Sequence, residues 1–338
     1  MKQPATLRQV AELAGVSRSA VSRTFTEGAS VAAKTRAKVL QAAKQLGYSP
    51  NLLARGLTTR RTSLIGLASD NFHNPAFLEI FDLFTRELQQ RGFRPLIVNL
   101  TSDYTPEKLV EMIRQYSMDA IILASSALGP DYASALQEQN IPVVQAFTRN
   151  RGKVSVNTVG IDNRACGGMA AEHLVALGYR SLAFLGGPRS ATTTIDRWAG
   201  FRKALGRYPE IEVSVSYAAE YSFGSGRVEM QRLLQEAPAQ AYFCGDDVLS
   251  FGAMSAIRDA GLVIPRDVGI LGVNDIEIAG WAGIELTTIR QPIREIIFGA
   301  VELVIAALKD PHRAVEQRLY PFKLIERKTL PRLRRVED

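Results

Sequence analysis

The decisive stretch of this sequence is TLRQVAELAGVSRSAVSRTF, residues 6–25. Its first half carries small and apolar residues at the spacing that places them on one face of a helix. These residues are Leu7, Val10, Ala11 and Ala14. Thr6 is followed three residues later by Gln9, the pattern of a capping box, and Gly15 favours the left-handed turn that ends a helix. We therefore predict a short amphipathic helix between Thr6 and Gly15.

A second short helix is predicted directly after this turn. Ser17 is a typical helix-capping residue, and Val16, Ala20 and Val21 would face the first helix. The opposite face carries arginines and hydroxyls, namely Arg18, Ser19, Ser22 and Arg23. Two short helices joined by a glycine-containing turn predict a helix-turn-helix, in which the second helix reads DNA in the major groove.

The charge distribution supports a nucleic-acid partner for this part of the chain. The 338 residues have a formal net charge of +7. Residues 1–61 contain eleven basic and two acidic residues, which gives +9, whereas the remaining 277 contain 30 basic and 32 acidic residues, which gives −2. A protein that is basic for no particular functional reason would have its excess positive charge distributed evenly along the chain. Positive charge concentrated in one segment is typical of a DNA contact.

Composition indicates a globular protein of the cytoplasm without a metal or cofactor. The apolar content of 46% and charged content of 22% are ordinary values. Cys166 and Cys244 lack neighbours at metal-ligand spacing, so both are expected to be buried thiols. The histidines also lack clustered carboxylate or cysteine partners, so they are expected to have surface or packing roles. They are His73, His173 and His312. The sequence shows neither a signal peptide nor a run of about 18 apolar residues that could span a membrane.

Two further elements complete the N-terminal part. A third helix is predicted over residues 34–47, because its apolar face repeats at helical spacing and Gly47 and Pro50 end it. Residues 51–57 have a helical composition but are too few to form a stable helix alone. Gly56 destabilises such a helix by about 1 kcal/mol relative to alanine. We predict a hinge helix that folds on DNA and inserts an apolar side chain into the minor groove.

From residue 63 onward, short apolar runs alternate with amphipathic segments. The runs cover residues 63–69, 94–100, 120–125, 142–147, 181–187, 241–245 and 268–273. Helices are predicted near residues 76–91, 106–117, 131–139, 163–177, 195–206, 225–236, 247–260 and 292–308. This alternation predicts parallel sheets covered by helices on both faces. The number of units, and the run at 159–162 before a fresh helix, favour two similar lobes with a ligand cleft at the carboxyl ends of their strands.

The sequence resembles the LacI/GalR (lactose repressor/galactose repressor) family of transcriptional regulators. Residues 6–23 fit the pattern TLxxVAxxAGVSxxxVSR and residues 34–55 fit KTRxxVxxAAxxLGYxPNxxAR. The core resembles the family in NPAF (74–77), VGIDN (159–163), GYRSLAFLGG (178–187), RWAGF (197–201), CGDD (244–247), VIPRDVGILGVND (263–275) and LTTIRQP (286–292). The resemblance implies an α/β protein with an N-terminal three-helix helix-turn-helix headpiece and a two-lobed core with parallel sheets, like that of periplasmic binding proteins.

The resemblance implies a DNA-binding role for particular residues. Base edges would be read by Arg18, Ser19 and Arg23, because arginine can donate two hydrogen bonds to guanine. Phosphate contacts are implied for Thr6, Ser22, Lys34 and Thr35. The hinge would contribute Ala54, Arg55 and Leu57, with Leu57 as the minor-groove wedge. The remaining members of the predicted set are Leu7, Ser17 and Asn51. Ala32 stands where the family usually has serine, so a helix cap is expected to be missing there.

The resemblance also implies an effector site in the cleft. Arg197 stands at the family's ligand arginine, and its guanidinium suits vicinal hydroxyls or a carboxylate. Asp246 matches a second polar position. A third is occupied by Asn274, with Asp275 next to it, and Tyr221 matches a stacking aromatic residue. Weaker candidates, for which ordinary loop roles are the alternative, are Asn71, Phe72, Phe77, Ser125, Phe147, Arg149, Ser190, Thr192 and Trp281. The mixture of aromatic and polar groups favours a sugar or a sugar acid.

These features predict a domain organisation. The headpiece is expected at residues 1–50, the hinge helix and linker at 51–62, and the effector-binding and dimerisation core at 63–338. Within the core, one lobe is expected to comprise approximately 63–160 with 291–320, and the other 161–290 with 321–330.

The sequence therefore predicts a ligand-responsive repressor that binds operator DNA. Two headpieces on a pseudo-palindromic operator require a homodimer. The C-terminal segment contains Pro331 and no apolar heptads, so a dimer is favoured over a tetramer. One alternative is a solute-binding protein for transport, which would need an export signal and no headpiece. Another is a dinucleotide-binding enzyme, but no glycine-rich phosphate loop follows a strand, and no nucleophile and base pair is evident.

Overall fold

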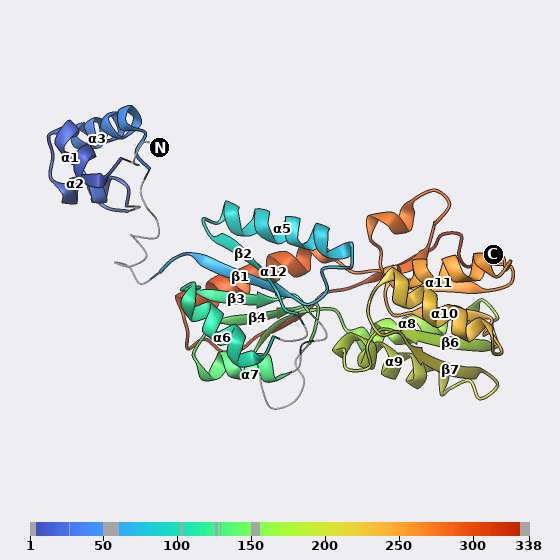
Figure 1. The fold of residues 1–338 in the computed structure, drawn as a ribbon. Helices are drawn as coiled ribbons and strands as arrows, with labels where there is room; N and C mark the ends of the chain where they lie inside the picture. Colours follow the sequence, from blue (N-terminus) through green and yellow to red (C-terminus); the bar gives the residue numbers. More distant parts are fainter. Residues whose placement is uncertain are drawn as a thin grey trace, which may run out of the picture. The chain divides into compact units, whose positions relative to one another are not determined.

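The computed structural model describes residues 5–26, 28–49, 61–101, 104–125, 128, 130–149 and 156–331. The chain divides into two compact units, Met1–Thr62 and Ser63–Asp338 (Figure 1). The hinge predictions for Asn51, Ala54, Arg55 and Leu57 lie outside the described residues and stay predictions. Within those ranges, no helix combines the length and apolar character needed to cross a membrane.

The N-terminal unit contains the three predicted helices. They are α1 (Leu7–Ala14), α2 (Arg18–Thr24) and α3 (Ala33–Leu46). The capping box is confirmed, because the Gln9 N–H donates to Thr6 Oγ1 and the Thr6 N–H donates to Gln9 Oε1. Gly15 adopts the left-handed conformation with φ of 63°. The small core is built around three fully buried valines, one from each helix: Val10, Val21 and Val39.

The missing cap before α3 is also confirmed and leads to a first prediction. Ala32 occupies the N-cap position of α3 and makes no side-chain hydrogen bond. We expect Ala32→Ser to raise the free energy of unfolding of the headpiece by about 1 kcal/mol, because the hydroxyl can accept a bond from an otherwise unsatisfied N–H. Chemical denaturation followed by circular dichroism measures this. Ala37→Ser, in the interior of α3, is the control and should not stabilise.

The first lobe of the core is built on a parallel sheet with the strand order β11-β5-β4-β3-β1-β2. The strands are β1 (Leu64–Ser69), β2 (Arg94–Asn99), β3 (Ala120–Leu123), β4 (Val143–Ala146), β5 (Asn157–Gly160) and β11 (Gln317–Leu319). Its helices are α5 (Ala76–Gln90), α6 (Pro106–Gln115), α7 (Pro130–Glu138) and α12 (Ile293–Lys309). Helix α12 packs against α5 and the central strands, and α6 packs against α7 on the other face (Figure 1).

The second lobe repeats this arrangement with the strand order β12-β10-β9-β8-β6-β7. The strands are β6 (Ser181–Gly186), β7 (Glu212–Tyr217), β8 (Ala241–Cys244), β9 (Gly269–Asn274), β10 (Thr287–Arg290) and β12 (Lys323–Ile325). Its helices are α8 (Asn163–Ala176), α9 (Thr192–Leu205), α10 (Phe223–Leu234), α11 (Asp247–Asp259) and the 3-10 helix η1 (Glu277–Gly280). All pairings in this sheet are parallel except that of β10 with β12.

The predicted fold class is confirmed. The sheets also contain strands that the apolar runs of the sequence did not indicate. Strands β7, β10, β11 and β12 were not anticipated, because each is short or rich in hydroxyl and charged residues. Helix α9 begins at Thr192, three residues before the predicted start at 195. In the described residues, the chain passes between the lobes after β5, after β10 and after β11. These crossovers bring the carboxyl ends of the strands of both sheets to one cleft.

Candidate functional site

The headpiece presents a polar face on α2. Ser17 Oγ accepts a hydrogen bond from the Ala20 N–H at 3.2 Å and so fixes the start of the helix. Val21 and Thr24 are buried, whereas the predicted DNA-contacting residues of α2 and its cap are exposed: Ser17, Arg18, Ser19, Ser22 and Arg23. Within the described ranges, no carboxylate forms an ion pair with Arg18 or Arg23. Both guanidinium groups are therefore available to an external acceptor.

The other predicted headpiece contacts lie at the helix starts. Thr6 and Lys34 are exposed, and Leu7 and Thr35 are partly exposed. The Thr6 hydroxyl already takes part in the capping box of α1. Its additional contact to a phosphate stays a prediction, as do the contacts of the other three residues. The arrangement places N–H groups of helix N-termini beside hydroxyl and ammonium groups, which is suited to anions.

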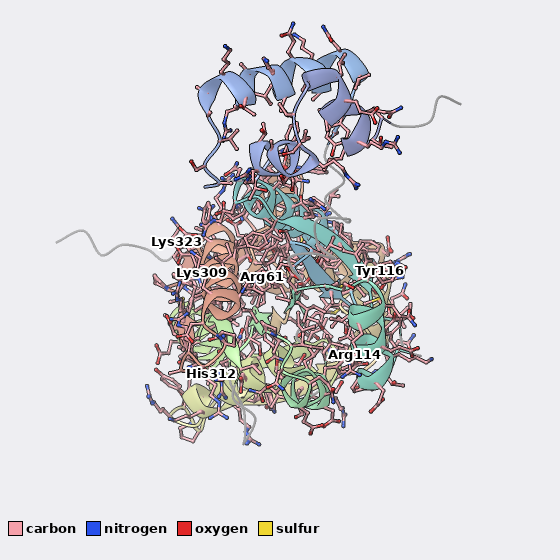
Figure 2. The ribbon with its side chains drawn as sticks, turned by 90° about the vertical axis from the view of Figure 1, so that its left-hand side faces the viewer. Arg61, Arg114, Tyr116, Lys309, His312 and Lys323 are labelled. Atoms are coloured by element: carbon pink, nitrogen blue, oxygen red, sulfur yellow. The ribbon has the colours of Figure 1, made fainter. Side chains whose placement is uncertain are left out.

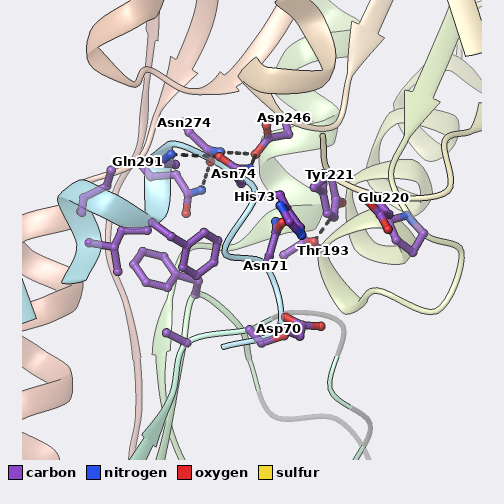
Figure 3. A pocket seen from close by; sticks show the side chains of 18 of the residues that line it. Asp70, Asn71, His73, Asn74, Thr193, Glu220, Tyr221, Asp246, Asn274 and Gln291 are labelled. Atoms are coloured by element: carbon purple, nitrogen blue, oxygen red, sulfur yellow. Dashed lines mark hydrogen bonds between the residues drawn. The ribbon is translucent and has the colours of Figure 1, made fainter. Parts of the chain in front are cut away.

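The core contains a cavity of about 190 Å³ between the two lobes, at the carboxyl ends of their strands (Figure 3). The first lobe contributes Asp70, Asn71, His73, Asn74, Ala76, Phe77, Ile80, Ala124, Ser125 and Phe147. The second lobe contributes Pro188, Thr193, Arg197, Glu220, Tyr221, Asp246 and Asn274, and the crossover after β10 adds Gln291 and Ile293. In open α/β sheets, ligands bind in this kind of crevice outside the carboxyl ends of the strands.

Most of the predicted effector residues lie at this cavity. They are Asn71, Phe77, Ser125, Phe147, Arg197, Tyr221, Asp246 and Asn274. Their contact with a ligand stays a prediction. His73, expected to have a surface or packing role, is exposed and also lines the cavity.

The remaining candidates do not line the cavity. Phe72 stacks on Phe81 with ring centroids 5.1 Å apart, and Ser190 is exposed on the loop before α9. Thr192 shares a hydroxyl hydrogen bond with Thr148 at 3.1 Å. The remaining three are Asp275, which forms ion pairs with Arg290 and Arg327; Arg149, which is paired with Asp196; and Trp281, which is exposed.

Arg197 is the most deeply placed charged group of the cavity, with 3% of its surface exposed. Its Nε donates to Asn163 Oδ1 at 2.8 Å and its Nη1 donates to the carbonyl oxygen of Gly245 at 2.5 Å. Arg197 therefore connects α9 to the start of α8 and the end of β8. The contacts hold the guanidinium in one orientation at the cavity wall.

Close packing of α8 and α9 makes this placement possible. A Cβ added to Gly167 would overlap the carbonyl oxygen of Arg197, and a Cβ added to Gly200 would overlap that of Arg164. Both neighbours are backbone atoms of the facing helix, so they cannot move aside cheaply. The two glycines thus allow the helices to approach at backbone distance.

Asp246 is the centre of a hydrogen-bond network that spans the lobes. Its Oδ1 accepts the Val248 N–H at 2.7 Å, which caps α11. Its Oδ2 accepts the amides of Asn74 at 3.2 Å and Asn274 at 2.7 Å, and Gln291 Nε2 donates to Asn274 Oδ1 (Figure 3). Asn74 belongs to the first lobe and Asp246 to the second. A ligand that engages Asp246 therefore acts on a contact between the lobes.

The electrostatic setting of Asp246 follows from its burial. Burial raises the pKa of its carboxyl to about 6, against the lowering effects of the Val248 N–H, the positive charge of Arg197 and the Asn74 amide. The neighbouring Asp247 is completely buried, and burial raises its pKa well above the usual range. Asp247 accepts bonds from the Thr288 hydroxyl at 2.6 Å and the Ile276 N–H at 3.0 Å. It joins α11 to β10, and Asp246 alone of the two faces the cavity.

Tyr221 and Asn274 are held in unusual positions at the cavity. A Cβ at Gly187 would overlap the Tyr221 ring, so glycine is needed for the ring to lie on the backbone there. The Tyr221 hydroxyl hydrogen-bonds to Thr193 at 3.1 Å and to Thr194 at 2.5 Å. Asn274 has φ of 122°, which is rare for a residue with a side chain and typical of functional sites. The turn directs Asn274 into the cavity and Asp275 away from it.

Several cavity residues were missed by the sequence analysis. They include Asp70, Asn74, Thr193, Glu220 and Gln291. Asp70 directly follows β1, and Gln291 directly follows β10. Glu220 lies on the loop that follows β7. The strand-end rule that suggested Asn71 and Ser125 would have found Asp70. Glu220 and Gln291 follow strands that the sequence did not indicate, so that rule had no starting point for them.

Comparisons with known proteins agree with this architecture. Residues 6–51 match the family described as bacterial regulatory proteins, lacI family, and residues 171–330 match the periplasmic binding protein-like domain. The chain is 33% identical to the HTH-type transcriptional regulator DegA of Bacillus subtilis over 86% of this chain and 88% of the relative.

Solved structures give the same result. A structure of the lac repressor dimer bound to operator and the anti-inducer ONPF is similar with a TM-score of 0.86 and 27% identity, over 97% of this chain and 100% of that one. A complex of the transcriptional regulator CelR with cellobiose is similar with a TM-score of 0.72 and 27% identity, over 96% and 99%. The likeness extends over residues of both described units.

Proposed function

Because the chain belongs to the lacI family of bacterial regulatory proteins, we propose that it is a repressor controlled by a small molecule bound in the core cavity. Members of this family are DNA-binding regulators and not enzymes. The observation that carries the proposal is the Asn74 to Asp246 hydrogen bond, which joins the lobes at the wall of that cavity. An effector there changes the contacts between lobes. Such control is a coupling free energy between two sites.

The proposed operator contacts follow from the exposed face of α2. Arg18, Ser19 and Arg23 read base edges in the major groove, and Lys34 and Thr35 at the start of α3 contact phosphates. Two headpieces are needed for two half-sites, so the active species is a homodimer. The lac repressor in the similar structure is itself a dimer on its operator. Light scattering at micromolar concentration tests the dimer, and a tetramer would contradict it.

The proposed effector is a sugar or a sugar acid. The cavity combines aromatic side chains with carboxylate, amide and guanidinium groups, a composition suited to hydroxylated rings. The similar CelR structure contains cellobiose, a sugar. A regulator that meets operator DNA and a metabolite works in the cytoplasm, where we place this protein.

The DNA-binding part of the proposal predicts two distinct mutant phenotypes. We expect Arg18→Ala to weaken operator binding by about 1–3 kcal/mol per headpiece and to relax base preference at one position, because it removes a base contact. We expect Lys34→Ala to weaken binding to all sequences alike and to reduce the salt slope by about 1 per headpiece, because it removes a phosphate contact.

Gel shifts at several salt concentrations, with operator and scrambled DNA, separate these outcomes. Arg266→Ala, an exposed arginine of the core paired with Asp267, is the control and should bind as the wild type does. Equal losses of Arg18→Ala on operator and scrambled DNA would contradict the assignment of base reading to α2.

A further inference from the structure

Strand β7 is the outer edge strand of the second lobe, and in the described part of the chain it pairs with β6 alone (Figure 1). The N–H groups of Glu212 and Ala218 donate to carbonyl oxygens on the β6 side, both at 2.8 Å. Backbone groups of successive strand residues point to opposite sides, so the alternate residues face outward. Val213, Val215 and Tyr217 therefore direct their N–H and C=O groups away from the sheet, as unpaired edges do.

The other edge strands of the two described sheets are less open to further pairing. Strands β11 and β12 have three residues each. Strand β2 holds the same place in the first sheet as β7 in the second, and it carries Pro95 at its second position. The Arg94 N–H donates toward β1, so position 95 faces outward, where proline removes the N–H that an added strand would need. Strand β7 has six residues, with Val213 at its second position and no proline.

An apolar strip continues from this edge onto helix α9. Val213 and Val215 are 39% and 40% exposed. In the strand register Val215 lies beside Phe184, and Trp198 of α9 stacks on Phe184 with ring centroids 5.8 Å apart. Alternation along β7 places Tyr217 on this same face. The valines and the two partly exposed rings thus line one side of the open edge.

Two arginines border this strip. The Arg189 guanidinium lies over the Tyr217 ring, 4.5 Å from its centroid, and the Arg202 guanidinium lies 6.0 Å from the Trp198 ring. Both arginines are exposed, and among the residues that the structure describes neither forms an ion pair with a carboxylate. Contacts with rings leave the N–H groups of a guanidinium free to donate to carboxylates from outside.

The acidic side chains near β7 lie away from the strip. Glu212 begins the strand, but alternation places it on the opposite face, where Ser216 hydrogen-bonds to Glu229 of α10. Glu210 precedes the strand, and Glu220 follows it at the wall of the core cavity. The face that β7 shares with α9 therefore combines apolar and positively charged groups beside an open edge.

We propose that β7 is a docking site for an extended, acidic segment of a partner protein, which adds a strand to the second sheet. The outward backbone groups of β7 supply the main-chain pairing, and its valines contact alternate apolar side chains of the segment. Arg189 and Arg202 bind its carboxylates. A nucleic acid would contact the arginines and rings but has no peptide backbone to complete the edge. None of the strip residues lines the core cavity, so this site is separate from the effector site.

The test is fluorescence anisotropy of the full-length protein with labelled heptapeptides. The acidic probe alternates glutamate and valine, and the basic probe alternates lysine and valine. A third probe has the acidic sequence with N-methylated amides, which cannot pair with a strand edge. We expect saturable binding of the acidic probe, weakened by added salt, and binding of the other two that is at least about tenfold weaker.

Variants of the edge and of its charge separate the two contributions. Val213→Pro copies the arrangement of Pro95 in β2, and because position 213 faces outward no bond to β6 is lost. It should weaken the acidic probe about tenfold, whereas Val213→Thr, which keeps the N–H, should bind within about twofold of the wild type. Arg189→Glu combined with Arg202→Glu should also weaken it about tenfold. Lys309→Glu, at the exposed end of α12 in the first lobe (Figure 2), is the charge control and should change nothing.

Several outcomes would overturn this assignment. They are the absence of saturable binding by the acidic probe, equal binding of the basic or N-methylated probe, and unchanged binding in both Val213→Pro and the double arginine variant. Tighter binding of a single-stranded oligonucleotide than of the acidic probe would replace the peptide by a nucleic acid. A wild-type tetramer that becomes a dimer in Val213→Pro would show that a second copy of this chain occupies the edge instead.

Discussion

Gly167→Ala is expected to lower the free energy of unfolding of the core by about 3 kcal/mol or more. The added methyl group meets the carbonyl oxygen of Arg197, a backbone atom in the middle of the facing helix α9. Relief of the overlap requires α8 and α9 to separate, which opens the packing between them. Alanine has a higher helix propensity than glycine, so the expected loss of stability comes from packing alone.

The adjacent Gly168 provides a matched control. It lies in the same helix, and a Cβ there meets nothing within 4 Å. Gly168→Ala is therefore expected to raise the free energy of unfolding by about 0.5–1 kcal/mol, the usual preference for alanine over glycine in a helix. Urea denaturation of both variants measures the difference. Similar stabilities for the two variants would show that α8 and α9 do not approach as closely as described.

The headpiece could be predicted from sequence because its signals are local. Thr6 and Gln9 are three residues apart, and Gly15 ends α1 by its own backbone preference. Ser17 directly precedes α2 and caps it by accepting a hydrogen bond from the Ala20 N–H. Each interaction joins residues within one helical turn, so spacing alone determines the partner.

The cavity was predictable only in part because its network joins distant residues. The strand-end rule places Asn74 and Asp246 on the correct edges of two different sheets. It gives no information on their contact, because 172 residues separate them and the contact depends on how the lobes close. Glu220 was missed for a related reason, since it follows the edge strand β7, whose two exposed valines alternate with serines and do not form an apolar run.

Two of the candidates that do not line the cavity have a common physical setting. Arg149 and Asp275 lie on loops that border the cleft, yet neither lines it. Each is attracted to a nearby opposite charge, Asp196 for Arg149 and Arg290 for Asp275. A polar residue on a strand-end loop can satisfy its charge within the protein, and sequence spacing does not reveal which of the two partners, ligand or side chain, is available.

Arg197→Ala is expected to abolish the response to the effector. A ligand at about 100 times its dissociation constant stabilises the wild type by about 2.7 kcal/mol. The variant should show no such gain, because the fixed guanidinium of the cavity wall is absent. Arg202→Ala, an exposed arginine on the same helix whose guanidinium lies 6.0 Å from the Trp198 ring, is the control and should retain the full gain. Equal ligand-induced shifts in wild type and Arg197→Ala would refute the assignment.

The same variant has a pH signature that does not depend on a ligand. Burial raises the folded-state pKa of Asp246 to about 6, above its ordinary value of 3.8, so this group's contribution makes the protein less stable as pH rises between about 4 and 6. Arg197 opposes the shift by favouring the charged carboxylate. Its removal raises the pKa of Asp246 further, so the loss of stability should continue above pH 6 in Arg197→Ala but not in the wild type.

Urea denaturation of the ligand-free protein between about pH 5 and 8 measures this difference. The slope of the free energy of unfolding against pH is proportional to the difference in the number of bound protons between the unfolded and the folded state. Burial raises the pKa of Asp247 in both proteins alike, so its contribution largely cancels in the comparison. In Arg197→Ala combined with Asp246→Asn the extra slope should disappear, because no titrating group remains at position 246. A slope that persists in the double variant would mean that Arg197 acts on another carboxylate, and its role would then be separate from the network that joins the two lobes.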